Sequence, residues 1–341
     1  MAETGHVPSH IHRPVARTTE GRFIRIPSRR WETLVVNTSA DPLVHHSAVP
    51  VPEADRHLDE LLSLLDLEVI EVNFFRGRQT DEARLRTFGG LVAAQALVAA
   101  GRTVDASKPV HSLHAYFLRP GDPKSPILYE VDRIRDGRSF ATRRVVAIQH
   151  GEAIFNLSAS FHVSEVGVAH QSAMPDAPDP ETLPTFSQRY EKFADQDWYR
   201  RPRPIDLRHA TEPVRTASQP RPPRQQVWFR PIGELPDDQL LHACIVAYAS
   251  DMSLLDSILL PHCVSWDDGS MMGMSLDHAM WFHRPFRASD WMLYNQESNV
   301  AFGARGLATG EIWTKSGELV VTVVQEGLIR LLRERSTGKE T

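Results

Sequence analysis

Hydrophobic residues change from helical to strand spacing within the first half of the chain. Leucines recur at helical spacing across residues 57–67, and the apolar run of residues 91–101, polar only at Gln95, predicts a helix buried on all sides. From residue 111 onward the period becomes two, which is typical of strands with one buried face. Turn sequences separate four predicted strands: His111–Leu118, Ile127–Ile134, Ser139–Gln149 and Ala153–Val163.

The same order of elements returns after residue 238. An apolar helical stretch, Leu240–Leu260, precedes strand-like runs near Met272–His283, Trp291–Ser298, Ala304–Thr314 and Leu319–Leu331. Short segments also match: residues 112–120 resemble residues 275–285, and His150-Gly151-Glu152 parallels Ser316-Gly317-Glu318. We interpret the chain as one α+β unit duplicated and fused, with the two units related by a pseudo-twofold axis and each sheet covering its own long helix.

The segments outside the repeats differ in composition. Residues 1–55 are rich in Pro, His, Arg and Ser, which predicts a flexible N-terminal extension. Half of the 24 prolines fall between residues 171 and 236, so regular structure should be scarce there. The predicted organisation is the extension, a first unit over 56–165, a proline-rich linker over 166–238, a second unit over 239–333 and a C-terminal tail over 334–341.

Length and charge narrow the class of protein. The 341 residues suffice for about two domains, and 41% hydrophobic with 24% charged residues is typical of folded proteins. A net charge of −5 offers no general field for nucleic acid, and no apolar run approaches a membrane span. Two cysteines, Cys244 and Cys263, are too few for a disulfide framework. With no secretory or peroxisomal signal recognised, we expect a cytoplasmic protein without nucleic-acid partners or integral membrane association.

Common catalytic motifs are missing from the sequence. It contains no Gly-x-Ser-x-Gly elbow, His-Glu-x-x-His zinc motif or Walker-type phosphate loop. Its histidines lack neighbouring Cys or carboxylate residues at ligand spacing, so we predict no metal site. Three polar residues in apolar surroundings are more informative. Asp251 follows a helical stretch whose pattern predicts burial, Gln325 ends a strongly apolar strand, and Ser275 opens the second set of strands.

From the sequence alone, a purely structural role explains each of these three residues as well as a chemical role does. Asp251 could bond Ser250 or Ser253 or begin a short second helix, Gln325 could make a cross-strand amide bond, and Ser275 could simply be a small strand residue. A buried carboxylate is nevertheless costly unless it has partners or a function. Burial would raise the pKa of Asp251 and donors would lower it, so the direction is open.

Longer motifs resemble the acyl-coenzyme A thioesterase II family, whose members have double hotdog folds. The resemblance covers residues 60–332 and leaves the first 55 residues outside. It rests on Phe75-Arg76-Gly77, Phe88-Gly89-Gly90, Val110-His111-Ser112, Tyr116–Asp122, Arg135–Phe140, Gln225–Arg230, Tyr248–Asp251, Leu259–His262, Asp277–Pro285 and Val324–Gly327.

The resemblance implies a function and a site. It implies hydrolysis of acyl-CoA to a free fatty acid and CoA by water that a triad of Asp251, Ser275 and Gln325 orients, without a covalent intermediate. Ser275 stands where Thr is more familiar, which keeps the hydroxyl and loses a stiffening methyl. We expect medium- to long-chain acyl groups and no cofactor, since CoA is part of the substrate.

The anionic CoA calls for local cations, and we considered Arg119, Arg284 and Arg305. An arginine beside a proline at a strand end more often serves a turn or packing. Three other functions stay open: an acyl-CoA binding or sensing protein with little turnover, a double hotdog hydratase, and a scaffold built around the N-terminal extension. Outer sheet edges and flat faces also predict a homodimer or homotetramer.

Overall fold

The computed structural model describes residues 53–80, 86–196, 199, 203–266 and 269–332. The predicted extension lies outside the described residues except for its last three positions, and the predicted C-terminal tail lies outside them entirely. No helix in the described ranges is both long enough and apolar enough to cross a membrane.

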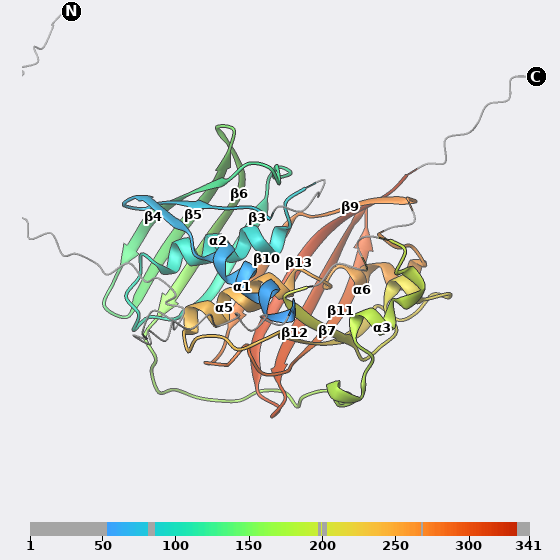
Figure 1. Ribbon diagram of the computed structural model, residues 1–341. Helices are drawn as coiled ribbons and strands as arrows, with labels where there is room; N and C mark the ends of the chain where they lie inside the picture. The colour runs from blue at the N-terminus through green and yellow to red at the C-terminus, as the bar shows by residue number, and fades with distance from the viewer. Residues whose placement is uncertain (1–52, 81–85, 197–198, 200–202, 267–268, 333–341) are drawn as a thin grey trace, which may run out of the picture. The chain divides into compact units, whose positions relative to one another are not determined.

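One continuous antiparallel sheet carries the described part of the chain (Figure 1). Its strands run in the order β1-β2-β4-β5-β6-β3-β10-β13-β12-β11-β8-β7, and β9 pairs with β13 beside this path. The first-half strands are β1 (Glu68–Glu71), β2 (Phe74–Gly77), β3 (Val110–Phe117), β4 (Ile127–Asp136), β5 (Phe140–Gln149) and β6 (Glu152–His162). The others are β7 (Ile205–His209), β8 (Arg224–Pro231), β9 (Met271–Ser275), β10 (Asp277–Phe282), β11 (Met292–Phe302), β12 (Arg305–Thr314) and β13 (Leu319–Leu331).

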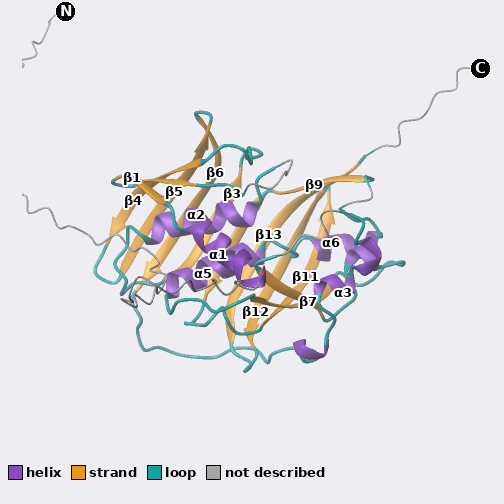
Figure 2. Cartoon of the chain, viewed as in Figure 1, coloured by secondary structure: helices purple, strands orange, loops and turns teal. Residues whose placement is uncertain are grey.

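Helices cover one face of this sheet (Figure 2). The two long central ones, α2 (Gly89–Gly101) and α5 (Gln239–Ser250), contact each other, and α1 (Glu53–Leu65) packs on α2. Every residue of α2 from Gly90 to Ala100 is buried, as the apolar run predicted. Gln95 bonds Leu64 O, Arg78 O and Tyr129, so its amide is satisfied inside the core.

The strand order is symmetric about the pair β3 and β10. Register places His114 opposite Ala279 at the centre of this pair and Ser112 opposite Trp281 near one end. A twofold axis at the centre therefore relates Ser112 to Asp277 and Arg119-Pro120 to Arg284-Pro285 with a constant offset. The match of residues 112–120 to the longer segment 275–285 had implied small insertions, and this part of the fold needs none. The predicted duplication into two similar halves is confirmed.

Two elements of the second half are divided where the sequence predicted continuity. The stretch Leu240–Leu260 consists of α5, a turn over residues 251–255 and the short helix α6 (Asp256–Leu259). The run Met272–His283 consists of β9 and β10, because the pairing with β13 is interrupted at Leu276. Both interruptions fall beside Asp251 or Ser275.

The proline-rich linker contains more regular structure than its composition predicted. Strands β7 and β8 lie within residues 166–238, and β8 pairs with β11 to extend the second half of the sheet. The segment Val227–Phe229 supplies buried apolar side chains, and the prolines nearest to the two strands lie at strand ends: Pro204 precedes β7, and Pro231 is the last residue of β8. Before β7 the described residues of the linker form short elements, including α3 (Phe186–Arg189).

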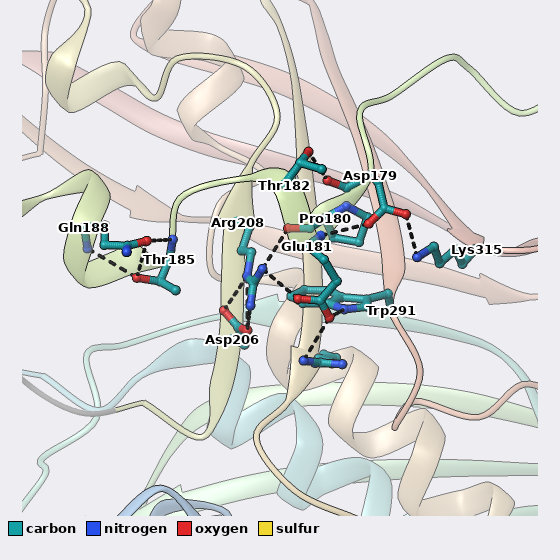
Figure 3. Close-up of polar contacts among 11 residues, drawn as sticks. Asp179, Pro180, Glu181, Thr182, Thr185, Gln188, Asp206, Arg208, Trp291 and Lys315 are labelled. Atoms are coloured by element: carbon teal, nitrogen blue, oxygen red, sulfur yellow. Dashed lines mark hydrogen bonds and ion pairs between the residues drawn. The ribbon is translucent and has the colours of Figure 1, made fainter.

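A polar cluster attaches this part of the linker to the sheet (Figure 3). Arg208 on β7 donates to Pro180 O at 2.8 Å, to Glu181 Oε2 at 3.0 Å and to Asp206 Oδ2 at 3.0 Å. Glu181 Oε1 also accepts from Trp291 Nε1 at 2.9 Å. Because the Arg208 side chain is only 11% exposed, its positive charge depends on these carboxylates.

We predict that Arg208→Gln lowers the free energy of unfolding by about 1–2 kcal/mol, because two carboxylates then lose their shared cation. Arg224→Gln is the matched control: Arg224 pairs with Glu297 but its side chain is 71% exposed, so its loss should cost less than about 0.5 kcal/mol. Urea unfolding measures both values. Equal losses in the two variants would contradict a structural role for the cluster.

Candidate active site

Asp251 stands at the C-terminal end of α5. The N-cap of this helix is Asp238, whose side chain accepts from the backbone N–H groups of Leu240 and Leu241. From Gln239 the helix runs through mostly buried apolar residues to Ser250. Asp251 follows as the C-cap residue and receives a hydrogen bond from the backbone N–H of Gly90 at the start of α2. The carboxylate thus lies where the end of one long helix meets the beginning of the other.

Ser275 and Gln325 reach the same carboxylate from the sheet. Gln325 Nε2 donates to Asp251 Oδ1 at 2.7 Å and to Ser275 Oγ at 2.9 Å, while Ser275 Oγ donates to Asp251 Oδ1 at 3.3 Å. Strand pairing explains their proximity: Ser275 on β9 is opposite Gly327 on β13, two residues beyond Gln325. The structure therefore brings together all three residues that the sequence singled out.

Enclosure by protein raises the pKa of Asp251 to about 6. Desolvation is the largest effect, and the donors Gln325, Ser275 and Gly90 oppose it. The carboxylate is accessible only in part, because one side of it faces a cavity. A carboxylate with this pKa is mostly ionised at neutral pH and can also accept a proton readily.

Because Gly89 has no side chain, the beginning of α2 can lie directly against the Asp251 carboxylate. A Cβ atom at Gly89 would lie 2.7 Å from Asp251 Oδ2 and 2.8 Å from the Phe117 ring. Both distances are shorter than van der Waals contact, so a larger residue would displace the carboxylate or the ring. The motif Phe88-Gly89-Gly90 is thus explained by the site it borders.

A cavity of about 610 Å³ has Asp251 and Ser275 in its wall. One group of its lining residues, which we call the first-half arm, includes Phe88, Val92, Phe117 and Ile154, together with exposed Arg86 and Arg119. A second group, which we call the aromatic arm, comes from the linker and the second half of the chain and contains many buried side chains. They include Tyr190, Tyr199, Leu207, His209, Val214 and Leu255.

Only one of the three arginines considered for CoA lines this cavity. Arg119 does, and it also pairs with Glu152 at 2.9 Å. Arg284 pairs with Glu318 at 3.5 Å and Arg305 with Glu326 at 2.9 Å, and neither borders the cavity. Arg305 and Glu326 occupy the sheet face opposite to Gln325, since neighbouring side chains of a strand alternate.

Sequence reasoning missed three arginines that do line the cavity: Arg86, Arg203 and Arg215. Arg86 is exposed, and within the described ranges no hydrogen bond or ion pair is found for it. Its position just before Phe88-Gly89-Gly90 was the available signal. Arg203 stacks on Phe186 and Arg215 on Phe193, and both belong to the linker, where no motif indicated them.

Within its described residues, the first half of the chain has no second copy of this polar site. The twofold axis relates Ser275 to Val110 and Gln325 to Ala159, both apolar and buried. The duplication therefore yields one candidate site for each chain. Among the residues whose placement is described, no group of three His, Cys, Asp or Glu side chains could hold a metal ion.

Comparison with solved structures defines the fold class. A hot dog fold protein from Alicyclobacillus acidocaldarius matches with a TM-score of 0.67 at 19% identity, over 80% of this chain and 99% of that one. An acyl-CoA thioesterase II from Mycobacterium marinum matches with a TM-score of 0.66 at 46% identity, over 80% and 98%. The predicted double hotdog fold is confirmed.

Sequence comparison then identifies the family. A family model described as acyl-CoA thioesterase matches residues 206–328, and one for an acyl-CoA thioesterase N-terminal domain matches residues 78–162. Human acyl-coenzyme A thioesterase 8 is 40% identical over 84% of this chain and 94% of its own length. Acyl-CoA thioesterase 2 of Haemophilus influenzae is 40% identical over 80% and 98%. The chain belongs to the acyl-CoA thioesterase II family and is an enzyme of the thioester hydrolase class.

We predict that kcat/KM falls about tenfold per pH unit below pH 6 and is level above it, because Asp251 accepts a proton only when ionised. The phosphates of CoA also titrate, so the profile should be measured with an S-acyl-N-acetylcysteamine thioester that has none. If kcat/KM for that substrate stays constant down to pH 5, Asp251 does not act as the general base.

Proposed function

We propose that the protein hydrolyses acyl-CoA thioesters with a water molecule that Asp251, Ser275 and Gln325 orient and Asp251 deprotonates. The observation that supports this most strongly is the convergence of Ser275 Oγ and Gln325 Nε2 on one carboxylate oxygen, Oδ1. The second oxygen, Oδ2, is left beside Gly89, which lines the cavity. Oδ2 is the atom to which we assign proton transfer from water.

The carbonyl oxygen of the substrate needs hydrogen-bond donors as negative charge develops on it. The first N–H groups of α2 have no partner within the helix, and Gly89 is next to Asp251. We assign the developing oxyanion to the Gly89 end of α2, where the helix dipole also favours negative charge. Water on Asp251 and carbonyl oxygen at α2 would then lie on adjacent sides of the reacting carbon.

The proposed reaction uses no protein nucleophile. The Ser275 hydroxyl accepts from Gln325 and donates to Asp251, so its proton and one lone pair are already engaged. In the described part of the chain no histidine bonds to Ser275, unlike the serine of a Ser-His-Asp triad. Water attacks, the C–S bond breaks and the thiolate of CoA leaves. No cofactor enters this scheme.

The two arms of the cavity suit the two ends of the substrate. Exposed Arg86 and Arg119 border the first-half arm, where the phosphates of CoA can keep contact with water. The aromatic arm is enclosed by buried rings and aliphatic side chains, which favours an acyl chain. We therefore propose medium- to long-chain acyl groups, with the chain beneath the linker segment.

Asp251→Asn should lower kcat at least about a hundredfold, because the amide cannot accept the proton from water. Thiol release from a panel of acetyl- to palmitoyl-CoA measures this loss and the chain preference together. Asp256→Asn is the control, since Asp256 lines the same cavity and accepts from Trp266 Nε1 at 2.6 Å; it should stay within about threefold of wild type.

Other outcomes of this assay would replace the proposal. A folded wild type that binds every ester without turnover would indicate an acyl-CoA sensing protein. Hydration of an enoyl-CoA without thiol release would indicate a hydratase. The cytoplasmic location and the homodimer or homotetramer stay predictions, which fractionation and sedimentation would test.

Arg86→Gln and Arg119→Gln should each raise KM for acyl-CoA about three- to tenfold by removing a phosphate contact, with kcat little changed. The increase should vanish with S-acyl-N-acetylcysteamine substrates, which have no phosphates. Arg284→Gln and Arg305→Gln serve as controls because neither side chain lines the cavity. Equal effects on both kinds of substrate would argue against phosphate binding.

A further inference from the structure

His278 is a buried polar residue that the proposed reaction does not use. It lies on β10 with 1% of its surface exposed. Its Nε2 atom is 2.8 Å from Ser250 Oγ, at the end of α5. Its other ring nitrogen, Nδ1, is buried and has no hydrogen-bond partner of ordinary geometry within the described ranges.

Gln325 is the cross-strand neighbour of His278. Strand β10 pairs with β13 through Met280 opposite Val323 and Ala279 opposite Val324, and His278 and Gln325 are the next residues on the two strands. Hydrogen bonding between these two side chains is one of the influences on the pKa of His278. Both side chains are directed to the inner face of the sheet, where each is buried. Gln325 Oε1 is likewise buried without an ordinary partner among the described residues, while its Nε2 donates twice.

The His278 ring is neutral near pH 7. Burial lowers its pKa to about 4, and hydrogen bonding by the Gln325 side chain opposes this effect only in part. A neutral imidazole has one N–H and one acceptor nitrogen, so the proton is on either Nδ1 or Nε2.

The two positions of this proton are not equivalent. With the proton on Nε2, the ring donates to Ser250 Oγ, and two buried acceptors on neighbouring residues, Nδ1 of His278 and Oε1 of Gln325, have no donor. With the proton on Nδ1, the ring can donate to Gln325 Oε1 and accept from the Ser250 hydroxyl at Nε2. The second arrangement satisfies all of these buried groups, at the cost of the 3.0 Å hydrogen bond from Ser250 to Ala247 O.

We propose that His278 is a positioning residue: its Nδ1–H donates to Gln325 Oε1 and keeps the Gln325 amide N–H groups directed at Asp251 and Ser275. This inference rests on the proposed role of Gln325. It extends the site by a chain of contacts from Ser250 through His278 to the amide that orients the water.

The Gln325 amide needs this additional hydrogen bond during the reaction itself. While Asp251 is ionised, its charge alone attracts the Gln325 N–H groups. Once Asp251 has taken the proton from water, that attraction weakens, and the amide can rotate to present Oε1 instead. A donor fixed behind the amide prevents this rotation, so its loss should reduce kcat more than it changes KM.

The first half of the chain shows that this place in the sheet does not need a polar pair for packing. The twofold axis relates His278 to Leu113 and Gln325 to Ala159, which pair with each other between β3 and β6 and are fully or nearly fully buried. Apolar residues therefore fill the equivalent position where no catalytic carboxylate is present.

NMR of the ring nitrogens of His278 in the full-length wild type tests the proton position directly. Comparison with His278→Asn assigns its signals. We expect the Nδ1–H tautomer, which is the minor form of free histidine in water, over pH 6–8. An Nε2–H tautomer or a charged ring would overturn the proposal, whatever the activity assays show.

Two amide variants separate positioning from simple packing. The shorter amide introduced by His278→Asn can place its N–H near the former Nδ1, whereas the longer amide of His278→Gln reaches towards Ser250 and offers no donor to Gln325. We expect His278→Asn to keep kcat within about threefold, and His278→Gln and His278→Leu to lose about tenfold or more at nearly constant KM. Equal losses in all three would overturn the proposal. If the variants fail to fold, the wild-type tautomer decides.

The triad mechanism and the positioning role of His278 would be disproved by different results. Full activity of Asp251→Asn would remove the proposed role of the triad without moving the tautomer of His278. An inactive Asp251→Asn together with an Nε2–H tautomer would keep the triad and remove only the positioning role. The assay of Asp251→Asn is therefore carried out alongside the NMR measurement.

Discussion

Strands β3 and β10 pair in antiparallel register from Ser112 and Trp281 to Tyr116 and Asp277, and this pairing joins the two halves into one sheet. It also sets α2 and α5 against each other on the same face, as Figure 1 shows. The beginning of α2 thereby meets the end of α5, where Gly90 donates to Asp251. The candidate site exists only because two halves, each with its own helix and strands, are held in this one register.

Symmetry of the fold and asymmetry of the site have different physical origins. Backbone pairing and apolar burial tolerate many side chains, so both halves can keep the same strand order. A buried carboxylate is tolerated only with donors around it. The second half provides them through Ser275 and Gln325, and the first half has Val110 and Ala159 at the related positions, which provide none.

The electrostatic cost of the site is concentrated on Asp251. Enclosure disfavours its charge and raises its pKa to about 6, while three donors limit the rise. A more open carboxylate would be a weaker base, and one with fewer donors would keep its proton to a higher pH. The surrounding hydrogen bonds therefore keep Asp251 ionised at neutral pH and fix the orientation of its carboxylate. Our proposal for His278 extends this hydrogen-bond network into the sheet.

Local patterns predicted the elements whose signals are strong over several residues. The wholly apolar run of α2 and the alternation along β3 to β6 and β11 to β13 appear in the structure with boundaries shifted by a few residues. The short strands β1 and β2 were missed because four residues give too short a pattern: β1 is exposed throughout, and β2 buries only two alternate residues. Strands β7 and β8 were missed because their prolines dominate the composition of the segment, although they flank the strands rather than interrupt them.

The sequence by itself determined the duplicated α+β organisation, and it marked Asp251, Ser275 and Gln325 as polar residues in apolar surroundings. Only the tertiary structure decided that Ser275 and Gln325 meet at one carboxylate oxygen of Asp251, that Arg119 and Arg86 border the cavity while Arg284 and Arg305 do not, and that the His278 side chain lies beside that of Gln325. The reason is physical. Periodicity records which face of an element is buried, but strand register and the contact between α2 and α5 decide which buried groups meet.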